Sequence, residues 1–261
     1  MNKKALFFDI DGTLWDYNRY IPASTREAID LLHRNGHSVF INSGRSKGHI
    51  TAPELLDMGF DGIISGCGTT IEYQGELIFL RLMDNDFTAQ CIETVRHYGF
   101  KPILEGIEFL YMDPEEFEGD PYGEKLRREM GERIIPIRSS WKEWQVVKFS
   151  CDTENADREA CFNILSRDFD LLIHDEKVVE CVPLGFSKGT GIEKVCELLD
   201  LDIQDTIAIG DSINDLGMFR TAGLSIVLGQ APEKIKKEAD YVTASLWEDG
   251  IYNACRHFEL I

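Results

Sequence analysis

Short apolar runs alternate with amphipathic stretches over the first 65 residues of the chain. The run Ala5–Phe8 is continuous, as is typical of a parallel strand buried on both faces, and 39–41 and Gly62–Ser65 repeat this pattern. Ser24, followed three residues later by Glu27, predicts a capping box at the start of an amphipathic helix between the first two strands. This alternation of strand and helix predicts a parallel sheet with crossover helices.

The pattern changes near residue 70, where apolar segments pair around short polar turns. The segments 71–79 and 103–111 each predict an antiparallel hairpin. Helices are predicted near 87–98, 121–130 and 156–167, and strands at 146–149, 171–174 and 178–182. Because hairpins and helices are mixed here, we expect a separate α+β unit.

The alternation of strand and helix returns in the last third of the chain. It predicts a helix near 189–199, a strand at 206–209, a helix from about Asn214 and a strand at 224–228. We therefore expect an α/β protein. Its core is a Rossmann-like, doubly wound parallel sheet formed by residues 1–80 and 182–261, with an inserted α+β cap domain at 81–181.

The composition and net charge of the chain exclude some classes of protein and disfavour some classes of partner. The 261 residues are 43% hydrophobic and carry 46 Asp and Glu against 27 Lys and Arg, a net charge of -19. A compact protein is expected, and nucleic acid or anionic lipid is a disfavoured partner. The seven cysteines form no C-x-x-C pair, which favours the reducing cytoplasm, and no apolar run is long enough for export or membrane insertion. Nothing in the sequence indicates the oligomeric state.

Two pairs of acidic residues follow predicted strand ends. Asp9 and Asp11 come directly after the first strand, and Asp211 and Asp215 follow the apolar segment 207–209. Like charges at buried strand ends are costly unless a cation compensates, and oxygen ligands in this number suit Mg²⁺. Each pair taken alone also fits a simpler structure, a solvent-facing turn for the first and an ordinary helix N-cap for the second.

One further strand end and one helix start carry groups that could bind an anion. Ser43 and Gly44 follow the strand at 39–41 with a hydroxyl and a backbone N–H, and Lys188 precedes the helix at 189–199 with a positive charge. Ser43 could also be only a helix cap, and Lys188 only a solvated surface residue. The order of the four segments along the chain favours a shared chemical role.

The four segments D-x-D-G-T-L, S-G-R, S-K-G and G-D-x-x-N-D, in this order, resemble the motifs of the haloacid dehalogenase (HAD) superfamily of phosphohydrolases. The long insert resembles the type IIB cap of the Cof-like sugar-phosphatase group, so the resemblance covers essentially the whole chain. One position departs from the pattern, because relatives commonly carry Asn-Gly-Ala where this chain has Cys67-Gly68-Thr69. We interpret Cys67 as a small buried residue rather than a reactive thiol.

The resemblance implies a role for each motif residue. Asp9 would be the nucleophile that forms an aspartyl phosphate, and Asp11 the general acid and base. Mg²⁺ would be bound by the Asp9 carboxylate, the Asp11 backbone carbonyl and the Asp211 carboxylate, with Asp215 in support. The phosphoryl oxygens would be held by Ser43, the Gly44 amide, Lys188 and Asn214.

The function expected from these residues is an Mg²⁺-dependent phosphatase for a small phosphorylated metabolite such as a sugar phosphate. A phosphomutase would use the same aspartyl phosphate and stays open as an alternative. A non-catalytic receiver-like phosphoprotein fits less well, because Asp11 and the insert have no role there. No motif indicates which substrate the cap selects.

Overall fold

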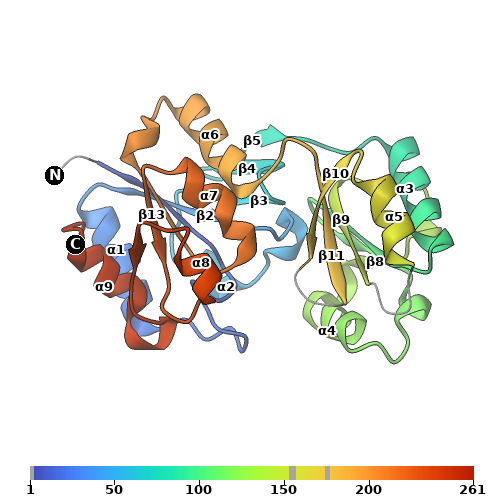
Figure 1. Ribbon diagram of the computed structural model, residues 1–261, viewed down its shortest axis with the longest axis horizontal. Helices are drawn as coiled ribbons and strands as arrows, with labels where there is room; N and C mark the ends of the chain where they lie inside the picture. The colour runs from blue at the N-terminus through green and yellow to red at the C-terminus, as the bar shows by residue number, and fades with distance from the viewer. Residues whose placement is uncertain (1–2, 153–156, 174–176) are drawn as a thin grey trace. The chain divides into compact units, whose positions relative to one another are not determined.

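The computed structural model describes residues 3–152, 157–173 and 177–261, and the chain forms two compact units (Figure 1). The core unit consists of Met1–Gly44, Ala52–Phe79 and Phe186–Ile261, and the insert unit of Arg45–Thr51 and Leu80–Gly185. The segment Arg45–Thr51 thus lies in the insert unit although it directly follows Ser43 and Gly44. It packs there so closely that a Cβ on Gly48 would lie 2.8 Å from the backbone of Glu108. Nothing in the sequence pattern indicated this contact.

The core unit is built on an eight-stranded sheet in the order β14-β13-β12-β1-β2-β3-β4-β5. The strands are β1 (Ala5–Phe8), β2 (Ser38–Asn42), β3 (Gly62–Ser65), β4 (Thr70–Tyr73), β5 (Glu76–Leu80), β12 (Thr206–Gly210), β13 (Leu224–Val227) and β14 (Tyr241–Val242). Strands β14 to β3 are parallel, and β4 runs antiparallel to β3. The chain moves outward from β1 in one direction and from β12 in the other. Such a reversal of strand order places a binding crevice at the carboxyl ends of the strands.

Helices cover both faces of the core sheet (Figure 1). They are α1 (Ala23–Arg34), α2 (Pro53–Leu56), α6 (Lys188–Leu199), α7 (Leu216–Thr221), α8 (Glu233–Lys236) and α9 (Gly250–His257), with 3₁₀ turns η5 (Ile203–Asp205), η6 (Ile213–Asp215) and η7 (Leu246–Glu248). Phe7 and Phe40 stack with their ring centroids 4.9 Å apart in the cluster that packs against α6 and α7. All four residues of β1 are buried, which explains its continuous apolar run. The predicted α/β class with a doubly wound parallel sheet is confirmed.

The predicted capping box at the start of α1 is wrong. The helix begins at Ala23 after Pro22, so Ser24 lies inside the first turn rather than before it. A capping side chain needs the non-helical backbone of the preceding position to reach the free N–H groups. The Ser24 hydroxyl is buried and, among the residues that the structure describes, has no hydrogen-bond partner.

The insert unit contains a six-stranded sheet in the order β10-β11-β9-β6-β7-β8. Its strands are β6 (Lys101–Gly106), β7 (Leu110–Tyr111), β8 (Ile134–Ile135), β9 (Val146–Asp152), β10 (Phe169–Ile173) and β11 (Val178–Pro183). Its helices are α3 (Asn85–His97), α4 (Pro121–Met130) and α5 (Arg158–Leu165), with 3₁₀ turns η1 (Lys47–His49), η2 (Pro114–Phe117), η3 (Gly131–Arg133) and η4 (Arg138–Ser140). Except for the parallel pair β7 and β8, the neighbouring strands of this sheet pair antiparallel, as the α+β prediction expected. Residue 156 of the helix predicted near 156–167 and residue 174 of the strand predicted at 171–174 lie outside the described residues.

Neighbouring residues of β6 pack on opposite faces of the insert sheet. Leu104 belongs to the apolar cluster formed with α3 and α5, and Ile103 to a second cluster that includes Leu126 of α4. Both predicted hairpins are confirmed, since β4 and β5 are hydrogen-bonded neighbours joined by a two-residue turn and β6 pairs antiparallel with β7. Strand β6 continues through Gly106, so Glu105 lies in the strand rather than in the turn. The insert therefore has apolar cores of its own on both sides of its sheet.

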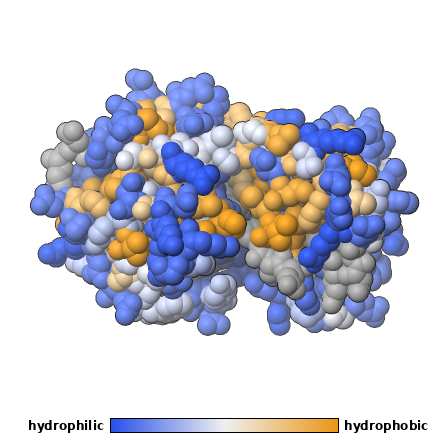
Figure 2. All heavy atoms as spheres, viewed as in Figure 1, coloured by the Kyte–Doolittle hydropathy of each residue, from blue (hydrophilic) through white to orange (hydrophobic). Residues whose placement is uncertain are grey.

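On the face seen in Figure 2, hydrophobic areas lie among hydrophilic ones on both units. The seven cysteines are buried free thiols. Within 3–152, 157–173 and 177–261, no helix has the length and apolar character needed to cross a bilayer.

Candidate active site

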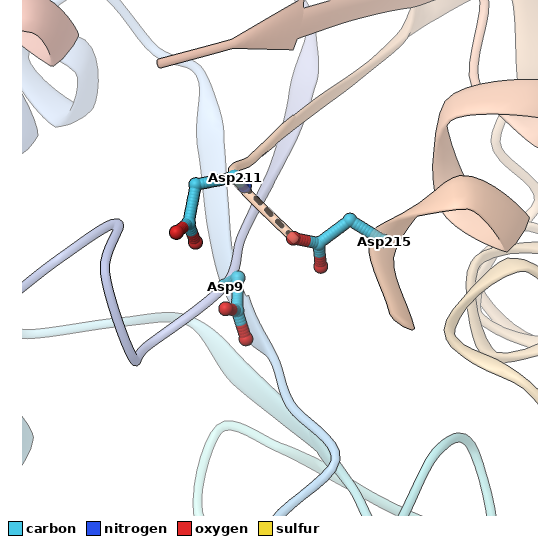
Figure 3. A group of neighbouring side chains, drawn as sticks. All are labelled: Asp9, Asp211 and Asp215. Carbon is cyan, nitrogen blue, oxygen red and sulfur yellow. Dashed lines mark hydrogen bonds between the residues drawn. The ribbon is translucent and has the colours of Figure 1, made fainter. Parts of the chain in front are cut away.

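Three carboxylates converge at the carboxyl edge of the core sheet (Figure 3). Asp9 follows β1 and Asp211 follows β12, and these strands pair in parallel with Phe8 opposite Ile209. Asp215 is the last residue of the η6 turn. One oxygen from each carboxylate lies within 4.8 Å of the others. The sheet register thus brings together acids that are about 200 residues apart in sequence.

The backbone after β12 is held by Asp215. Its Oδ2 accepts hydrogen bonds from the N–H groups of Asp211 and Ser212, both at 2.8 Å. These bonds close a short turn, and the Asp211 carboxylate lies near that of Asp9 (Figure 3). The Asp215 side chain itself is fully buried.

Lys188 joins the acidic residues into one network. Its Nζ lies 2.5 Å from Asp9 Oδ1, 2.6 Å from Asp215 Oδ1 and 3.2 Å from Asn214 Oδ1. A capping box between Ser187 and Thr190 sets the start of α6 and so the place of this lysine. Its side chain is 0% exposed, which excludes the alternative of a solvated surface lysine.

The charges in this network do not balance. Burial, together with the neighbouring carboxylates, raises the pKa of Asp9 well above its usual value although Lys188 opposes the shift. Burial and Asp215 likewise raise the pKa of Asp211 to about 7, against the effect of a hydrogen bond from Thr13. Burial disfavours the charged ammonium, but Asp215 and Asp9 outweigh it and raise the pKa of Lys188.

Three carboxylates and one ammonium leave two negative charges, which is the charge that one divalent cation neutralises. The candidate ligands in this group of carboxylates are all oxygen atoms, the type that Mg²⁺ prefers. The residues present therefore fit a magnesium ion.

Gly12 and Thr13, which follow β1, contact the Asp211 carboxylate. Gly12 has φ +86°, and a Cβ at this position would lie within van der Waals overlap of Asp211 Oδ2. The Thr13 hydroxyl donates to Asp211 Oδ1 at 3.0 Å. Asp11 has an exposed side chain whose Oδ1 accepts a hydrogen bond from Trp15 Nε1 at 2.9 Å. A glycine is needed at position 12 because the carboxylate occupies the space of a side chain.

Ser43 and Gly44 follow β2, the strand next to β1, and both residues are buried. The Ser43 N–H donates to Ile64 O, and its carbonyl accepts from Cys67 N at 3.1 Å. Cys67 has φ +55° and is 1% exposed, which confirms its interpretation as a small buried residue. Asparagine tolerates this left-handed conformation better than cysteine does, which gives a physical reason for the asparagine that the family resemblance led us to expect here.

Sequence reasoning missed three residues that shape the site. Thr13 is one letter of the D-x-D-G-T-L motif, and Trp15 follows that motif without a sequence signal of its own. Gln230 belongs to none of the four motifs, although its Nε2 donates to Gly12 O at 2.6 Å and its Oε1 accepts from Leu246 N at 2.9 Å. Gln230 lies 218 residues from Gly12, so no local pattern could have indicated the contact.

Comparison with known proteins finds relatives along the whole chain. Residues 6–255 match the model of a family described as haloacid dehalogenase-like hydrolases. The chain is 32% identical over 266 residues to YkrA of Bacillus subtilis, provisionally named a phosphatase, with both chains covered completely. It is 37% identical over 264 residues to a phosphoglycolate phosphatase of Methanosarcina acetivorans, covering 99% of this chain and 98% of that one.

Solved structures show the same arrangement of elements. A structure of a HAD subclass IIB sugar phosphatase matches with a TM-score of 0.82 at 25% identity, over 99% of this chain and 100% of that one. A protein from Geobacillus kaustophilus matches with a TM-score of 0.83 at 25% identity, over 100% of both chains.

Proposed function

This chain belongs to the haloacid dehalogenase-like hydrolases and is a phosphatase, and from this premise we propose that it hydrolyses a small phosphorylated metabolite through an aspartyl phosphate on Asp9. The observation that carries the proposal is the convergence of Asp9, Asp211 and Asp215 around the buried Lys188. The oxygen-rich, negatively charged site supports dependence on Mg²⁺.

The metal ligands in this proposal are the Asp9 carboxylate, the Asp11 backbone carbonyl and the Asp211 carboxylate. When bound there, Mg²⁺ supplies positive charge for the oxygens of the transferring phosphoryl group. Asp215 acts in support, because its Oδ1 already contacts Lys188 and its Oδ2 accepts from two backbone N–H groups. It thereby positions Asp211 and neutralises the lysine.

In the first step, a carboxylate oxygen of Asp9 attacks phosphorus, and the bond from phosphorus to the leaving oxygen breaks. Asp11 donates its proton to that oxygen. In the second step, Asp11 takes a proton from water, the water oxygen attacks phosphorus, and the bond to Asp9 breaks to release inorganic phosphate. The groups that donate to the phosphoryl oxygens are Ser43, the Gly44 amide, Lys188 and Asn214.

A small phosphorylated metabolite is the proposed substrate, with sugar phosphates as the first class to test. One structural neighbour is a sugar phosphatase and one relative a phosphoglycolate phosphatase, so relatives of this chain differ in the alcohol that they release. We assign the selection of that alcohol to the insert unit. The seven buried free thiols support a place in the reducing cytoplasm.

The test is release of inorganic phosphate from p-nitrophenyl phosphate and from a panel of sugar phosphates, with Mg²⁺ and with a chelator. We expect turnover that needs Mg²⁺, disappears in Asp9→Asn and persists in Asp30→Asn, a matched substitution at an exposed position of α1. Acid quenching during turnover should trap a phosphoryl group on the peptide that contains Asp9. Absence of turnover on every substrate, or an active Asp9→Asn enzyme, would overturn the proposal.

A further inference from the structure

Trp15 holds the carboxylate of Asp11 by a hydrogen bond. The indole Nε1 donates to Asp11 Oδ1 at 2.9 Å, and the Trp15 side chain is buried although that of Asp11 is exposed. A backbone bridge joins the two residues, and the Gly12 N–H donates to Trp15 O at 2.9 Å. The donor and the acceptor therefore sit at the two ends of one closed turn.

The Trp15 ring is buried, and a cation lies over it. The guanidinium of Arg19 lies 5.5 Å from the centre of the ring. Asp16 Oδ1 accepts from the N–H groups of Asn18 and Tyr20, at 2.8 and 2.9 Å, which closes the loop that carries Arg19. A donor held in this way needs no reorganisation when it binds the carboxylate.

Asp11 lies two residues after Asp9 and directly before Gly12, where an added Cβ would overlap the Asp211 carboxylate. Burial is the main cause of the raised pKa of Asp9 and of Asp211, and the charge of Asp11 adds to both shifts. Asp11 therefore stands close enough to interact with both carboxylates while its Oδ1 is bound to the indole.

We propose that Trp15 is a positioning residue, which fixes Asp11 so that its second oxygen, Oδ2, faces the oxygen of the leaving alcohol. This inference rests on the proposed function, in which Asp11 gives its proton to that oxygen. Removing the indole N–H opens further rotamers to the Asp11 side chain, and only some rotamers bring the carboxyl group within hydrogen-bond distance of the substrate. Misplacing a reacting group by about 1 Å costs on the order of 10²-fold in rate.

Substrates with different leaving groups distinguish a role of Trp15 in positioning Asp11 from a role in packing alone. A sugar alkoxide is a poor leaving group and needs the proton of Asp11, whereas p-nitrophenolate leaves without one. The ratio kcat/KM reports the first phosphoryl transfer for both substrates. Losing the position of Asp11 should therefore lower kcat/KM for a sugar phosphate much more than for p-nitrophenyl phosphate.

The experiment is a double-mutant cycle with Trp15→Phe, Asp11→Asn and the double variant. Phenylalanine keeps an aromatic ring and removes the N–H donor. We expect Trp15→Phe to lower kcat/KM for the best sugar phosphate by about 10 to 100-fold and for p-nitrophenyl phosphate by less than about 3-fold. In the Asp11→Asn background, Trp15→Phe should lower kcat/KM no further, because Trp15 acts through the carboxyl group that this background lacks, and the effects of coupled residues do not add. Asp30→Asn, at an exposed position of α1 in the core unit, is the control and should leave both rates unchanged.

Nuclear magnetic resonance of the indole N–H groups tests the hydrogen bond without changing Trp15. The chain has four tryptophans, and one indole signal should move in Asp11→Asn and stay in place in Asp30→Asn. If Trp15→Phe does not fold, this measurement still tests the hydrogen bond between Trp15 and Asp11 on which the proposal depends. Equal losses on both substrates, an additive cycle, or four unmoved indole signals would overturn the role of Trp15 while the phosphatase stands. An unsubstituted enzyme without turnover would instead overturn the proposed function and this role with it.

Discussion

Replacing Asp211 with asparagine should make the metal-free protein more stable at neutral and alkaline pH. Asparagine nearly matches aspartate in shape, and its Oδ1 can still accept the hydrogen bond from the Thr13 hydroxyl. It cannot ionise, however, so the core keeps one negative charge fewer beside Asp9 and Asp215. The change removes electrostatic repulsion and leaves the packing in place.

The size of the effect follows from the pKa of Asp211. Burial and Asp215 raise it from the ordinary value of 3.8 to about 7. Because the folded-state pKa is above the unfolded value, the folded protein binds the extra proton, and its stability falls as pH rises from about 4 to about 7. From pH 5 to pH 8 the pKa shift corresponds to a loss of about 3 kcal/mol in the unfolding free energy, at about 1.4 kcal/mol per pH unit up to the folded pKa.

The assay is urea unfolding with a chelator at several pH values, comparing the unsubstituted protein with Asp211→Asn. Trp15 and Trp247 lie in the core unit, and Trp141 and Trp144 lie in the insert unit. Tryptophan fluorescence of variants in which one of these pairs is replaced therefore assigns each unfolding transition to one unit. We expect Asp211→Asn to gain stability relative to the unsubstituted protein as pH rises from 5 to 8. Asp30→Asn, the exposed control, should change stability by less than about 0.5 kcal/mol at each pH.

Saturating Mg²⁺ should reverse the order of stability. It binds the folded unsubstituted protein and stabilises it in proportion to the logarithm of its concentration, and the variant lacks one of the proposed ligands. A stability difference that stays flat between pH 5 and pH 8 in the chelator would refute the argument that the carboxylates repel one another in the folded core. An equal effect of Mg²⁺ on both proteins would refute Asp211 as a ligand.

Three further substitutions test other parts of the site. Asp9→Asn should lower phosphate release by about 10³-fold or more with an unchanged circular dichroism spectrum, and a residual rate close to the unsubstituted one would contradict its role as nucleophile. Lys188→Met keeps the length of the side chain but leaves Asp9 and Asp215 without their cation, so urea unfolding in a chelator should show a loss of about 3–5 kcal/mol. Gly12→Ala places a Cβ against Asp211 Oδ2 at a φ of +86°, so calorimetric titration should show about 10-fold weaker Mg²⁺ binding.

The sequence determined the core sheet and where its acidic residues lie. A strand covered by helices on both faces must be apolar at every position, which made β1 and its end at Asp9 recognisable from local composition. Parallel strands end at a common edge, so Asp9 and Asp211 could be expected there together. The capping box at Ser24 was wrong because the choice between adjacent starting residues of a helix depends on the chain before it, here Pro22.

Only the tertiary structure decided which side chains touch. Lys188 reaches Asp9 across 179 residues of sequence, and Gln230 reaches Gly12 across 218. The sequence places Lys188 only at the start of a helix, whereas the structure shows it buried and paired with Asp9 and Asp215. Local periodicity reports only whether a residue faces water or the core. The partner of a buried charge is chosen by strand register and helix packing, which depend on the whole chain.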